Sequence, residues 1–480
     1  MIKKKKEGSE LIKFKRTSNN ENISSFVDGL IKEFKIIQKH LSRKKKILIN
    51  LIANLVINHN RGLNTAIPRS ESFYSKIKTR YKSDIISHDL IVEFIDLMKS
   101  NDKYVIEKYK ASRNEFGEAS LYSPSNLLIK HCKDDIINNY TLLEDECILL
   151  RKKIINNNTI SNGELTQNTS SSSSDEVTVE ETISSGIEDE GEITQKHRKM
   201  LVDYSDTDYT RSIRSDLNEY NRFRIQNTFS LKGLPMNMLD KKYKENIQRF
   251  ASVNISKLIP DAKNRVTVPL APDHLVRIFT EDFEKGGRFY RGFETQLKKE
   301  LRPFIAINGE PTVEFDYSNY HIRMLYHLHN KRCPDDPYTV FEGLDPDDGR
   351  DYYKTMVAAC LNNNNEKSVL RTMRYYITKN GLRDYFSDIT NEGLKAGLKL
   401  LLNHNRKVAQ YLFHGDGLEY HKIDSDIAND IMMYFTRLKK PILVLCVHDS
   451  FIIARTHSDQ LHRAMNKFYR AKVHKYPKIK

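Results

Sequence analysis

Cysteine is scarce in this 480-residue sequence and is not arranged for metal binding. The five cysteines include no Cys-x-x-Cys pair, and Cys446 lies within the strand-like run 442–447. Structural zinc sites are typically built from closely spaced cysteine pairs, and disulfide frameworks belong to secreted proteins. The pattern therefore excludes a zinc finger and favours buried thiols in a reducing compartment.

Long apolar runs are also missing. No segment approaches the roughly 20 apolar residues that are needed to cross a bilayer. The first residues, Met1-Ile2-Lys3-Lys4-Lys5-Lys6, lack the apolar stretch of a signal peptide. We therefore expect a cytoplasmic protein that has no membrane partner.

Acidic residues are outnumbered, and many are gathered in one segment. The sequence has 78 lysine and arginine residues against 63 aspartate and glutamate residues, a formal net charge of +15. Every charged residue from Asn156 to Gln195 is acidic, so the rest of the chain is more basic than the total indicates. A basic excess of this kind favours an anionic polymer as the partner.

The acidic segment divides the chain. It contains the run Ser170 to Ser174 and little aromatic or large apolar content, so it cannot bury enough surface to offset its chain entropy. We predict a disordered, serine-rich acidic linker at 156–198. It would join a basic, mostly helical domain at 1–155 to a second domain at 199–480.

The N-terminal domain shows two helical patterns. Phe26, Leu30, Phe34, Ile37 and Leu41 are spaced as one apolar stripe. A further helix is predicted after Ser87, a typical N-cap residue, with its apolar positions between residues 90 and 98.

Strand-like residues follow this second helix. They lie at 104–106 and 121–122, on either side of the polar, glycine-containing stretch 111–117, and lysines and an arginine flank the helix at 76–82. A helix followed by a hairpin resembles a winged helix, a common DNA-binding module. The alternative is a small helical domain that only packs on the rest of the protein.

Two aspartates stand where apolar strands end. Asp316 follows the strand-like run Thr312 to Phe315, and Asp449 lies between the runs 442–447 and 451–454, at the tip of a predicted hairpin. Two carboxylates brought together in this way repel each other unless a cation lies between them. A pair of Mg²⁺ ions would remove that repulsion and would suit phosphoryl transfer.

The residues around these aspartates resemble the palm motifs of the family A DNA polymerases and the phage-type single-subunit RNA polymerases. The first motif of that family is Asp-Tyr-Ser followed by a Glu and an Arg, and the last is His-Asp-Glu, or His-Asp-Ser in the RNA polymerases. This chain has Asp316-Tyr317-Ser318 followed by His321 and Arg323, and later His448-Asp449-Ser450. The resemblance covers about residues 270 to 455.

The resemblance implies an α+β fold with the palm, fingers and thumb of a right hand. It implies catalysis by Asp316 and Asp449, which with the backbone carbonyl of Tyr317 would bind two Mg²⁺ ions, or Mn²⁺ in their place. The thumb would come from helical residues before 270, including Ile213 to Phe229. A helix within 415–430 would run under the template.

A fingers helix is predicted to begin at Asp345-Pro346. Arg350 and Lys354 then share one face near its N-terminus, where cations are unfavourable against the helix dipole unless an anion lies there. The same Arg-x-x-x-Lys of the family grips the triphosphate of the incoming nucleotide. The aromatic residues that follow in the DNA polymerases are replaced here by Ala358 and Asn362.

Further site residues follow from the resemblance. Gly286-Gly287-Arg288, with Gln296 and Arg302 after it, is similar to the stretch before the first palm motif. It implies that Arg288 and Gln296 contact the primer end of the nucleic acid and that Arg302 lies near phosphate.

The sugar and primer sites are also implied. His321 stands where DNA polymerases carry a Glu that blocks a ribose 2′-hydroxyl, so its bulk favours dNTPs, and Tyr317 would pack beneath this sugar site. His448 would orient the primer terminus. Ser450 replaces a carboxylate of the DNA polymerases, so Asp316 and Asp449 would bind the metals alone.

The sequence as a whole predicts a template-dependent DNA polymerase, a nucleotidyltransferase that acts on a DNA template-primer and dNTPs. The N-terminal region lacks an ordered set of acidic metal ligands, so no proofreading exonuclease is expected. A phage, plasmid or other mobile element is the setting inferred from the small size. The alternatives are an RNA polymerase or primase-like enzyme, and a DNA-binding replication initiator with an inactive polymerase fold.

Overall fold

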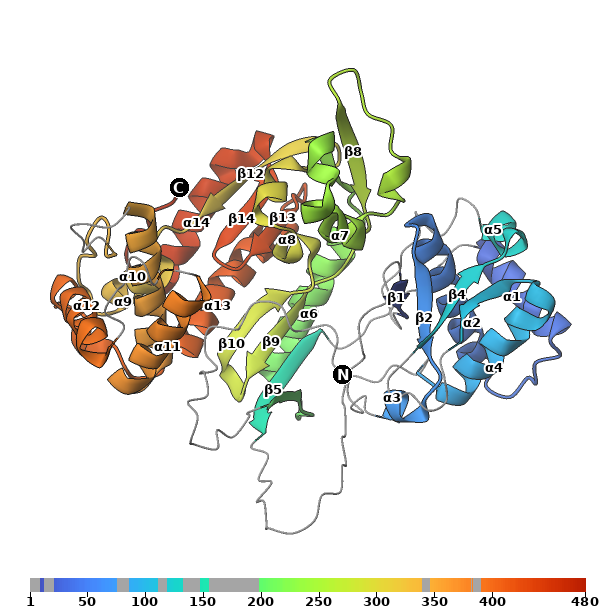
Figure 1. Ribbon diagram of the computed structural model, residues 1–480, viewed down its shortest axis with the longest axis horizontal. Coiled ribbons are helices and arrows are strands. Elements are labelled where there is room, and N and C mark those ends of the chain that lie inside the picture. Colours follow the sequence, from blue (N-terminus) through green and yellow to red (C-terminus); the bar gives the residue numbers. More distant parts are fainter. Residues whose placement is uncertain are drawn as a thin grey trace, which may run out of the picture.

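The computed structural model combines helices and sheets in two bodies, each with its own hydrophobic core (Figure 1). It describes residues 9–12, 21–75, 86–110, 119–132, 147–154, 198–338, 346–380, 382 and 390–480. Buried residues between Ile12 and Cys132 form the smaller core, and those from Cys147 onward form the larger one. Within these ranges, no helix combines the length and the apolar character needed to cross a membrane.

The smaller body is a four-stranded sheet packed against helices. Its strands are β1 (Ser9–Leu11), β2 (Asn64–Pro68), β3 (Val105–Tyr109) and β4 (Ala119–Pro124), in the order β1-β2-β4-β3. Its helices are α1 (Glu21–Glu33), α2 (Leu41–Asn60), α3 (Glu71–Ser75), α4 (His88–Lys99) and α5 (Asn126–Cys132). Strand β1 is parallel to β2, and the other pairs are antiparallel. Helical residues outnumber strand residues in this body, and its sheet includes β1 and β2, which the sequence did not predict.

The apolar stripe predicted from Phe26 to Leu41 does not belong to one helix. Helix α1 ends at residue 33 and α2 begins at residue 41. Lys35 and His40 adopt φ angles of 50° and 58°, which a right-handed helix cannot contain. Ile37, between these two residues, is 74% exposed.

The helix predicted after Ser87 is present as α4, and the strands predicted after it pair as the β3–β4 hairpin. Ile91, Phe94 and Ile95 bury the apolar face of α4 in the smaller core. The residues at 76–82 and 111–117 lie outside the described residues.

The larger body contains two sheets. Six antiparallel strands form the first, in the order β13-β14-β12-β11-β7-β8. They are β7 (Phe229–Pro235), β8 (Arg265–Leu270), β11 (Ile305–Ile307), β12 (Glu310–Asp316), β13 (Val444–Val447) and β14 (Ser450–Ala454). The second sheet has the order β10-β9-β5-β6. Its strands are β5 (Ile148–Ile154), β6 (Arg198–Leu201), β9 (Val276–Thr280) and β10 (Asp282–Tyr290).

Helices surround these sheets. They are α6 (Asp208–Arg224), α7 (Lys241–Phe250), α8 (Phe293–Gln296), α9 (Tyr320–Leu328), α10 (Pro346–Asn362), α11 (Glu366–Lys379), α12 (Asn391–His404), α13 (Gly417–Thr436) and α14 (Ser458–Val473). Helices α10, α11 and α12 gather at one end of the body, and α14 lies along the six-stranded sheet (Figure 1).

Strand β5 corrects the domain boundary predicted at residue 155. It pairs in parallel with β9 and antiparallel with β6, and its residues belong to the larger core. The segment predicted as a linker, 156–198, therefore connects two neighbouring strands of one sheet. The boundary between the two bodies falls between Cys132 and Cys147. Nearly all of the segment lies outside the described residues, so its disorder stays a prediction.

Helix α6 also differs from its prediction. It ends at Arg224, and Phe229, predicted to be helical, begins strand β7. The buried Tyr220 hydroxyl of α6 donates to the backbone carbonyl of Val444 at 2.7 Å. This helix therefore packs into the larger core, and its assignment to a thumb stays a prediction.

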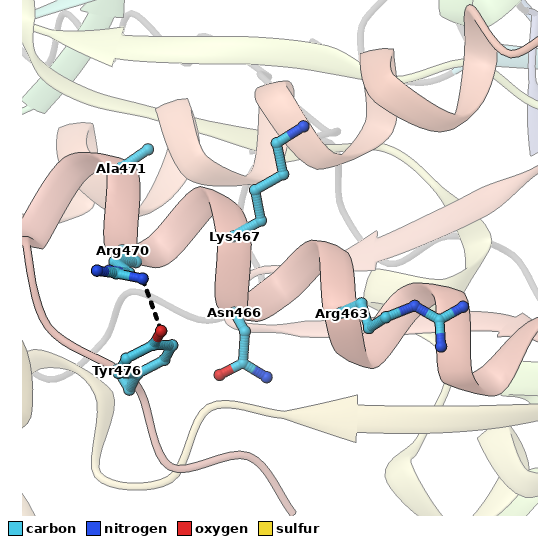
Figure 2. Close-up of a pocket in the computed structure, with 6 residues that line it drawn as sticks. All are labelled: Arg463, Asn466, Lys467, Arg470, Ala471 and Tyr476. Atoms are coloured by element: carbon cyan, nitrogen blue, oxygen red, sulfur yellow. Dashed lines mark hydrogen bonds between the residues drawn. The ribbon is translucent and has the colours of Figure 1, made fainter.

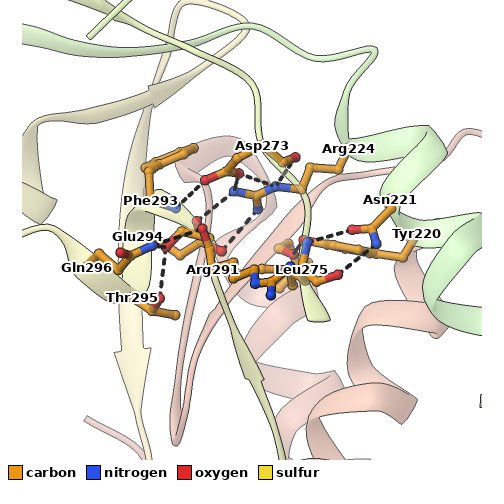
Figure 3. Close-up of polar contacts among 12 residues, drawn as sticks. Tyr220, Asn221, Arg224, Asp273, Leu275, Arg291, Phe293, Glu294, Thr295 and Gln296 are labelled. Atoms are coloured by element: carbon orange, nitrogen blue, oxygen red, sulfur yellow. Dashed lines mark hydrogen bonds and ion pairs between the residues drawn. The ribbon is translucent and has the colours of Figure 1, made fainter. Parts of the chain in front are cut away.

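A buried charge cluster fixes α6 to the chain that precedes β11 (Figure 3). The Arg224 guanidinium donates to both carboxylate oxygens of Glu294, at 3.0 and 2.7 Å, and to Asp273 Oδ1 at 2.5 Å. The side chains of Arg224 and Glu294 are fully buried. Burial raises the pKa of Asp273 to about 6, although Arg224 opposes the rise. One cation thus serves two carboxylates.

Candidate active site

Two strands bring Asp316 and Asp449 together. Asp316 ends β12, and Asp449 lies in the turn between β13 and β14. Strands β12 and β14 pair with Asp316 opposite Ser450, and the backbone N–H of Tyr317 donates to the backbone carbonyl of Asp449 at 3.2 Å. The two carboxylates therefore start from adjacent points of the backbone.

The β13–β14 turn has an unusual conformation. Val447 and Ser450 pair directly, so His448 and Asp449 form a two-residue connection. His448 has a φ of 56°, a backbone angle that residues other than glycine rarely adopt. Its ring packs edge-on against Tyr290, with 5.7 Å between the ring centroids. Backbone strain of this kind is often found at functional sites.

The charges at this edge are poorly balanced. Burial and the charge of Asp316 raise the pKa of Asp449 above its ordinary value. The Lys480 ammonium lies 3.0 Å from Asp316 Oδ2, and the backbones of residues 316 and 480 exchange two hydrogen bonds of 3.0 Å. Asp316 thus has one cation beside it, while Asp449 is disfavoured as a carboxylate.

A third carboxylate, Asp424, anchors two predicted site residues. It lies on α13 with its side chain fully buried. Arg288 Nη2 donates to Asp424 Oδ2 at 2.5 Å, and His321 Nε2 lies 2.9 Å from the same oxygen. Burial alone would raise the pKa of Asp424, but Arg288 and His321 hold it well below its ordinary value. Asp424 is therefore a fixed anion that positions both side chains.

His321 Nε2 has two competing neighbours. Besides Asp424, it lies 2.9 Å from Arg288 Nη2. An arginine nitrogen can only donate and an ionised carboxylate can only accept, so Nε2 can satisfy one of the two in a given protonation state. The His321 ring is half-buried, and it opposes the rise in the pKa of Asp449.

Arg302 has a carboxylate partner close to the catalytic edge. It forms an ion pair of 3.1 Å with Glu314, which lies two residues before Asp316 on β12. Ser450 Oγ donates to the same carboxylate oxygen that Arg302 contacts, Glu314 Oε1, at 2.6 Å. Glu314 thus lies beside Ser450, the position where the DNA polymerases have a carboxylate, and its charge is balanced by Arg302. The prediction that Arg302 meets phosphate did not foresee this partner.

Arg350, the first residue of the predicted phosphate-binding pair, lies near the catalytic edge. Helix α10 starts at Pro346 as predicted, and Asp345 lies outside the described residues. Arg350 donates to Asp336 at 3.0 Å and to Asn319, just after the first motif, at 2.7 Å. Lys354, one turn later, is exposed and forms no ion pair with a described residue.

Two predicted contacts are turned inward. The Tyr317 ring is 2% exposed, and its hydroxyl donates to the backbone carbonyl of Met465 at 2.7 Å. This ring can support the site but cannot touch a substrate, so only its backbone carbonyl remains as a ligand. The Gln296 amide donates to the backbone carbonyl of Arg291 at 3.0 Å and holds its own turn.

Asp424 and Glu314 were missed at the sequence level. Asp424 carries a signal, because it occupies the buried stripe of α13 between Tyr420 and Ile427, where a lone carboxylate needs a buried partner. Glu314 carries none, since alternation along β12 alone does not reveal which of its side chains meets Arg302.

The donor set for a metal is small. Among the described residues, no group of three or more His, Cys, Asp or Glu side chains is arranged to hold a metal ion. Asp424 and Glu314 are held by arginines, which leaves the Asp316 and Asp449 carboxylates and the backbone of Tyr317 as candidate oxygen ligands.

Comparison with known proteins gives little beyond this geometry. No family model matches the chain, and no curated protein matches it in sequence. One similar solved structure is the POL domain of Pol1 from M. smegmatis in complex with DNA primer-template and dNTP. It shares 13% sequence identity, the match covers 49% of this chain and 49% of that one, and the TM-score is 0.25. The chain thus spans about half the length of this weak, polymerase-type neighbour.

Proposed function

We propose that this protein is a template-dependent DNA polymerase that transfers nucleotides at the edge formed by β12 and the β13–β14 turn. The observation that carries the proposal is the adjacency of Asp316 and Asp449, fixed by the β12–β14 register and by the 3.2 Å bond from Tyr317 N–H to the Asp449 carbonyl. In this assignment the six-stranded sheet is the palm and α10 to α12 are the fingers.

The residues present fit divalent cations. Two carboxylates meet in a half-buried place, where burial and the charge of Asp316 raise the pKa of Asp449. Asp316, Asp449 and the Tyr317 carbonyl would hold Mg²⁺, which binds oxygen ligands. When bound, two such ions supply charge neutralisation for the attacking and leaving oxygens of phosphoryl transfer.

The other side chains then have separate roles. Arg350 and Lys354, one turn apart on α10, would neutralise the triphosphate and its departing pyrophosphate. Arg288, oriented by Asp424, would face the primer end, and His448 would lie beside it. Lys480 would leave Asp316 when the cations bind.

The N-terminal body is proposed as an accessory domain with winged-helix topology. Its order is helix α2, strand β2, helices α3 and α4, and the β3–β4 hairpin, with β4 between β2 and β3. Helix α4 exposes Asp89 and Glu93, which a DNA phosphate backbone would repel. We therefore propose that α4 does not enter a DNA groove, and that a role as DNA-binding initiator is the weaker alternative.

Primer extension tests the proposed function. A labelled DNA primer annealed to a longer template, with dNTPs and Mg²⁺, should be extended to the template end by the full chain. Extension from NTPs without a primer would replace this proposal by the RNA polymerase or primase-like alternative. No proofreading is expected, so a mismatched primer end should not be removed.

Divalent cations should change the thermal stability of the protein. The folded pKa of Asp449 lies above the unfolded value, so the stability of the folded protein falls as pH rises from the unfolded pKa through the folded pKa. Without divalent cations, Asp449→Asn should raise Tm by about 2–4 °C, equivalent to about 1 kcal/mol.

The Mg²⁺ response completes this test. Adding Mg²⁺ should raise the Tm of the wild-type protein, because an ion that binds the folded state stabilises it, and should have little effect on Asp449→Asn. Equal Mg²⁺ shifts in both proteins would show that the ion does not bind at Asp449.

Sugar selection should depend on His321. Replacing it by glycine removes the bulk that would meet a 2′-hydroxyl, so His321→Gly should lower the ratio of dNTP to NTP incorporation efficiency by at least about tenfold, or about 1.4 kcal/mol. His321→Gln, which keeps most of the bulk, serves as the matched control. An unchanged ratio in the glycine variant would remove His321 from the sugar site.

A further inference from the structure

The last 21 residues of the sequence carry many positive charges, which the proposed active site does not account for. From residue 460 to residue 480 the sequence contains seven lysines and arginines and no aspartate or glutamate. Four of these cations lie on α14, and the other three lie on the segment that follows it. Together they form a basic surface on the helix that covers the six-stranded sheet.

A hollow of about 540 Å³ lies in this surface (Figure 2). Its lining residues are Arg463, Asn466, Lys467, Arg470, Ala471 and Tyr476, and we call it the α14 groove. Arg463, Lys467 and Arg470 are spaced at i, i+4 and i+7, so they follow one face of the helix with about one turn between neighbours.

The three groove cations form no ion pair with a carboxylate in the part of the chain that the structure describes. By contrast, Arg211 and Arg437, which are also exposed, each meet carboxylates at 2.6 Å. Unpaired like charges in a hollow concentrate positive potential there, and an anion would be attracted to it.

Exposed aromatic rings accompany the cations. Tyr476 is 62% exposed and Tyr434 of α13 is 41% exposed. Arg470 donates to the Tyr476 hydroxyl at 2.6 Å and lies 4.8 Å from the ring centroid, and the Lys467 ammonium lies 5.1 Å from the Tyr434 centroid. Each ring is thus held by a groove cation and still presents surface to solvent.

The groove is joined to the proposed catalytic edge. Helix α14 ends at Val473, and His474, with a φ of 59°, turns the chain back. The following segment reaches residue 316, where Lys480 contacts Asp316. Lys480 is the fourth residue after Tyr476, so at most about 14 Å of extended chain joins them.

We propose that the α14 groove binds single-stranded nucleic acid. Cations in a row match a phosphodiester backbone, and adjacent exposed rings offer stacking surfaces that only unstacked bases can use. A paired duplex would satisfy the cations but leave the rings unused. This binding does not require the proposed nucleotidyl transfer, and the strand bound here would lie close to the catalytic edge.

Fluorescence anisotropy with a labelled oligo-dT of about 20 nucleotides tests the proposal on the full chain without Mg²⁺. Replacing Arg463, Lys467 and Arg470 by glutamine should weaken binding at least about tenfold. It should also lower the slope of log K against log salt by about 2, since each phosphate contact on a single strand contributes about 0.7. The matched control replaces Lys241, Lys244 and Arg249, three exposed cations of α7, by glutamine.

A second variant separates stacking from charge. Tyr476→Ala should weaken oligo-dT binding about tenfold and leave the salt slope unchanged, while Tyr476→Phe should bind as the wild type does. Because this side chain is largely exposed, its removal should not prevent folding. Asp449→Asn should keep wild-type affinity, which distinguishes a failure of the groove from a failure of catalysis.

Three results would overturn the groove assignment. The first is a triple glutamine variant with the affinity and salt slope of the α7 control. The second is a Tyr476→Ala variant that binds like the wild type. The third is competition by duplex DNA or by polyglutamate as effective as competition by unlabelled oligo-dT, which would identify a general anionic surface.

Discussion

Asp316→Asn or Asp449→Asn should reduce nucleotide incorporation by at least about a thousandfold, a barrier increase of about 4 kcal/mol. Each substitution keeps the size of the side chain and removes one of the two carboxylates that meet at the β12–β14 edge. Both carboxylates are proposed to act in the transition state through bound cations, so kcat should fall while nucleic-acid affinity changes little. Single-turnover incorporation on a primed template measures this rate.

A control on the same strand makes this result specific. Glu310, at the start of β12, is exposed, and its side chain accepts a hydrogen bond from Thr456 at 3.1 Å. Glu310→Gln removes a carboxylate from the same strand and should retain the wild-type rate. If either aspartate variant keeps more than about one-thousandth of that rate, the metal-binding role of that aspartate is wrong.

Arg224→Met should destabilise the folded protein by about 3–5 kcal/mol. The Arg224 guanidinium is the cation for both Glu294 and Asp273 in the cluster of Figure 3, and both Arg224 and Glu294 are fully buried. Its removal would leave the Glu294 and Asp273 carboxylates without their cation. Urea unfolding at neutral pH measures the loss as a change in the free energy of unfolding.

Two further variants test the cause. Arg211→Met, on the same helix, breaks an exposed pair with Asp208 and should cost less than about 1 kcal/mol. Adding Glu294→Gln and Asp273→Asn to Arg224→Met should recover part of the loss, because no uncompensated charge would remain. A loss no larger in Arg224→Met than in Arg211→Met would contradict the role of the cluster.

The parts of the fold that the sequence predicted are local ones. Apolar runs with a polar end located β12 and the β13–β14 hairpin, and hence the backbone positions of Asp316 and Asp449. Proline at a first helical position located the start of α10 at Pro346. In each of these cases the residues that determine the element lie within it.

The parts that could not be predicted depend on contacts between distant residues. Arg288 meets Asp424 although 136 residues separate them, and Arg302 meets Glu314 across the turn between β11 and β12. The local sequence around each of these residues does not identify its partner. Strands β5 and β6, which pair with each other, lie before and after the acidic segment in the sequence. Composition alone therefore placed the domain boundary wrongly.

Local patterning also failed where the backbone breaks a helix. The apolar spacing continues from Phe26 to Leu41, yet Lys35 and His40 adopt left-handed conformations and separate α1 from α2. Both helices contribute buried residues to the smaller core, and the spacing of apolar residues does not reveal the break between them.

The central proposal is tested most directly by single-nucleotide incorporation with the wild-type chain on a primed DNA template. Four reactions, each with one dNTP, are run on templates that differ in the first unpaired base, with Mg²⁺ or with EDTA. We predict that the dNTP complementary to that base is added to the primer in Mg²⁺ and that nothing is added in EDTA. Absence of incorporation in Mg²⁺ and in Mn²⁺, or addition that does not depend on the template base, would contradict a template-dependent polymerase built on Asp316 and Asp449.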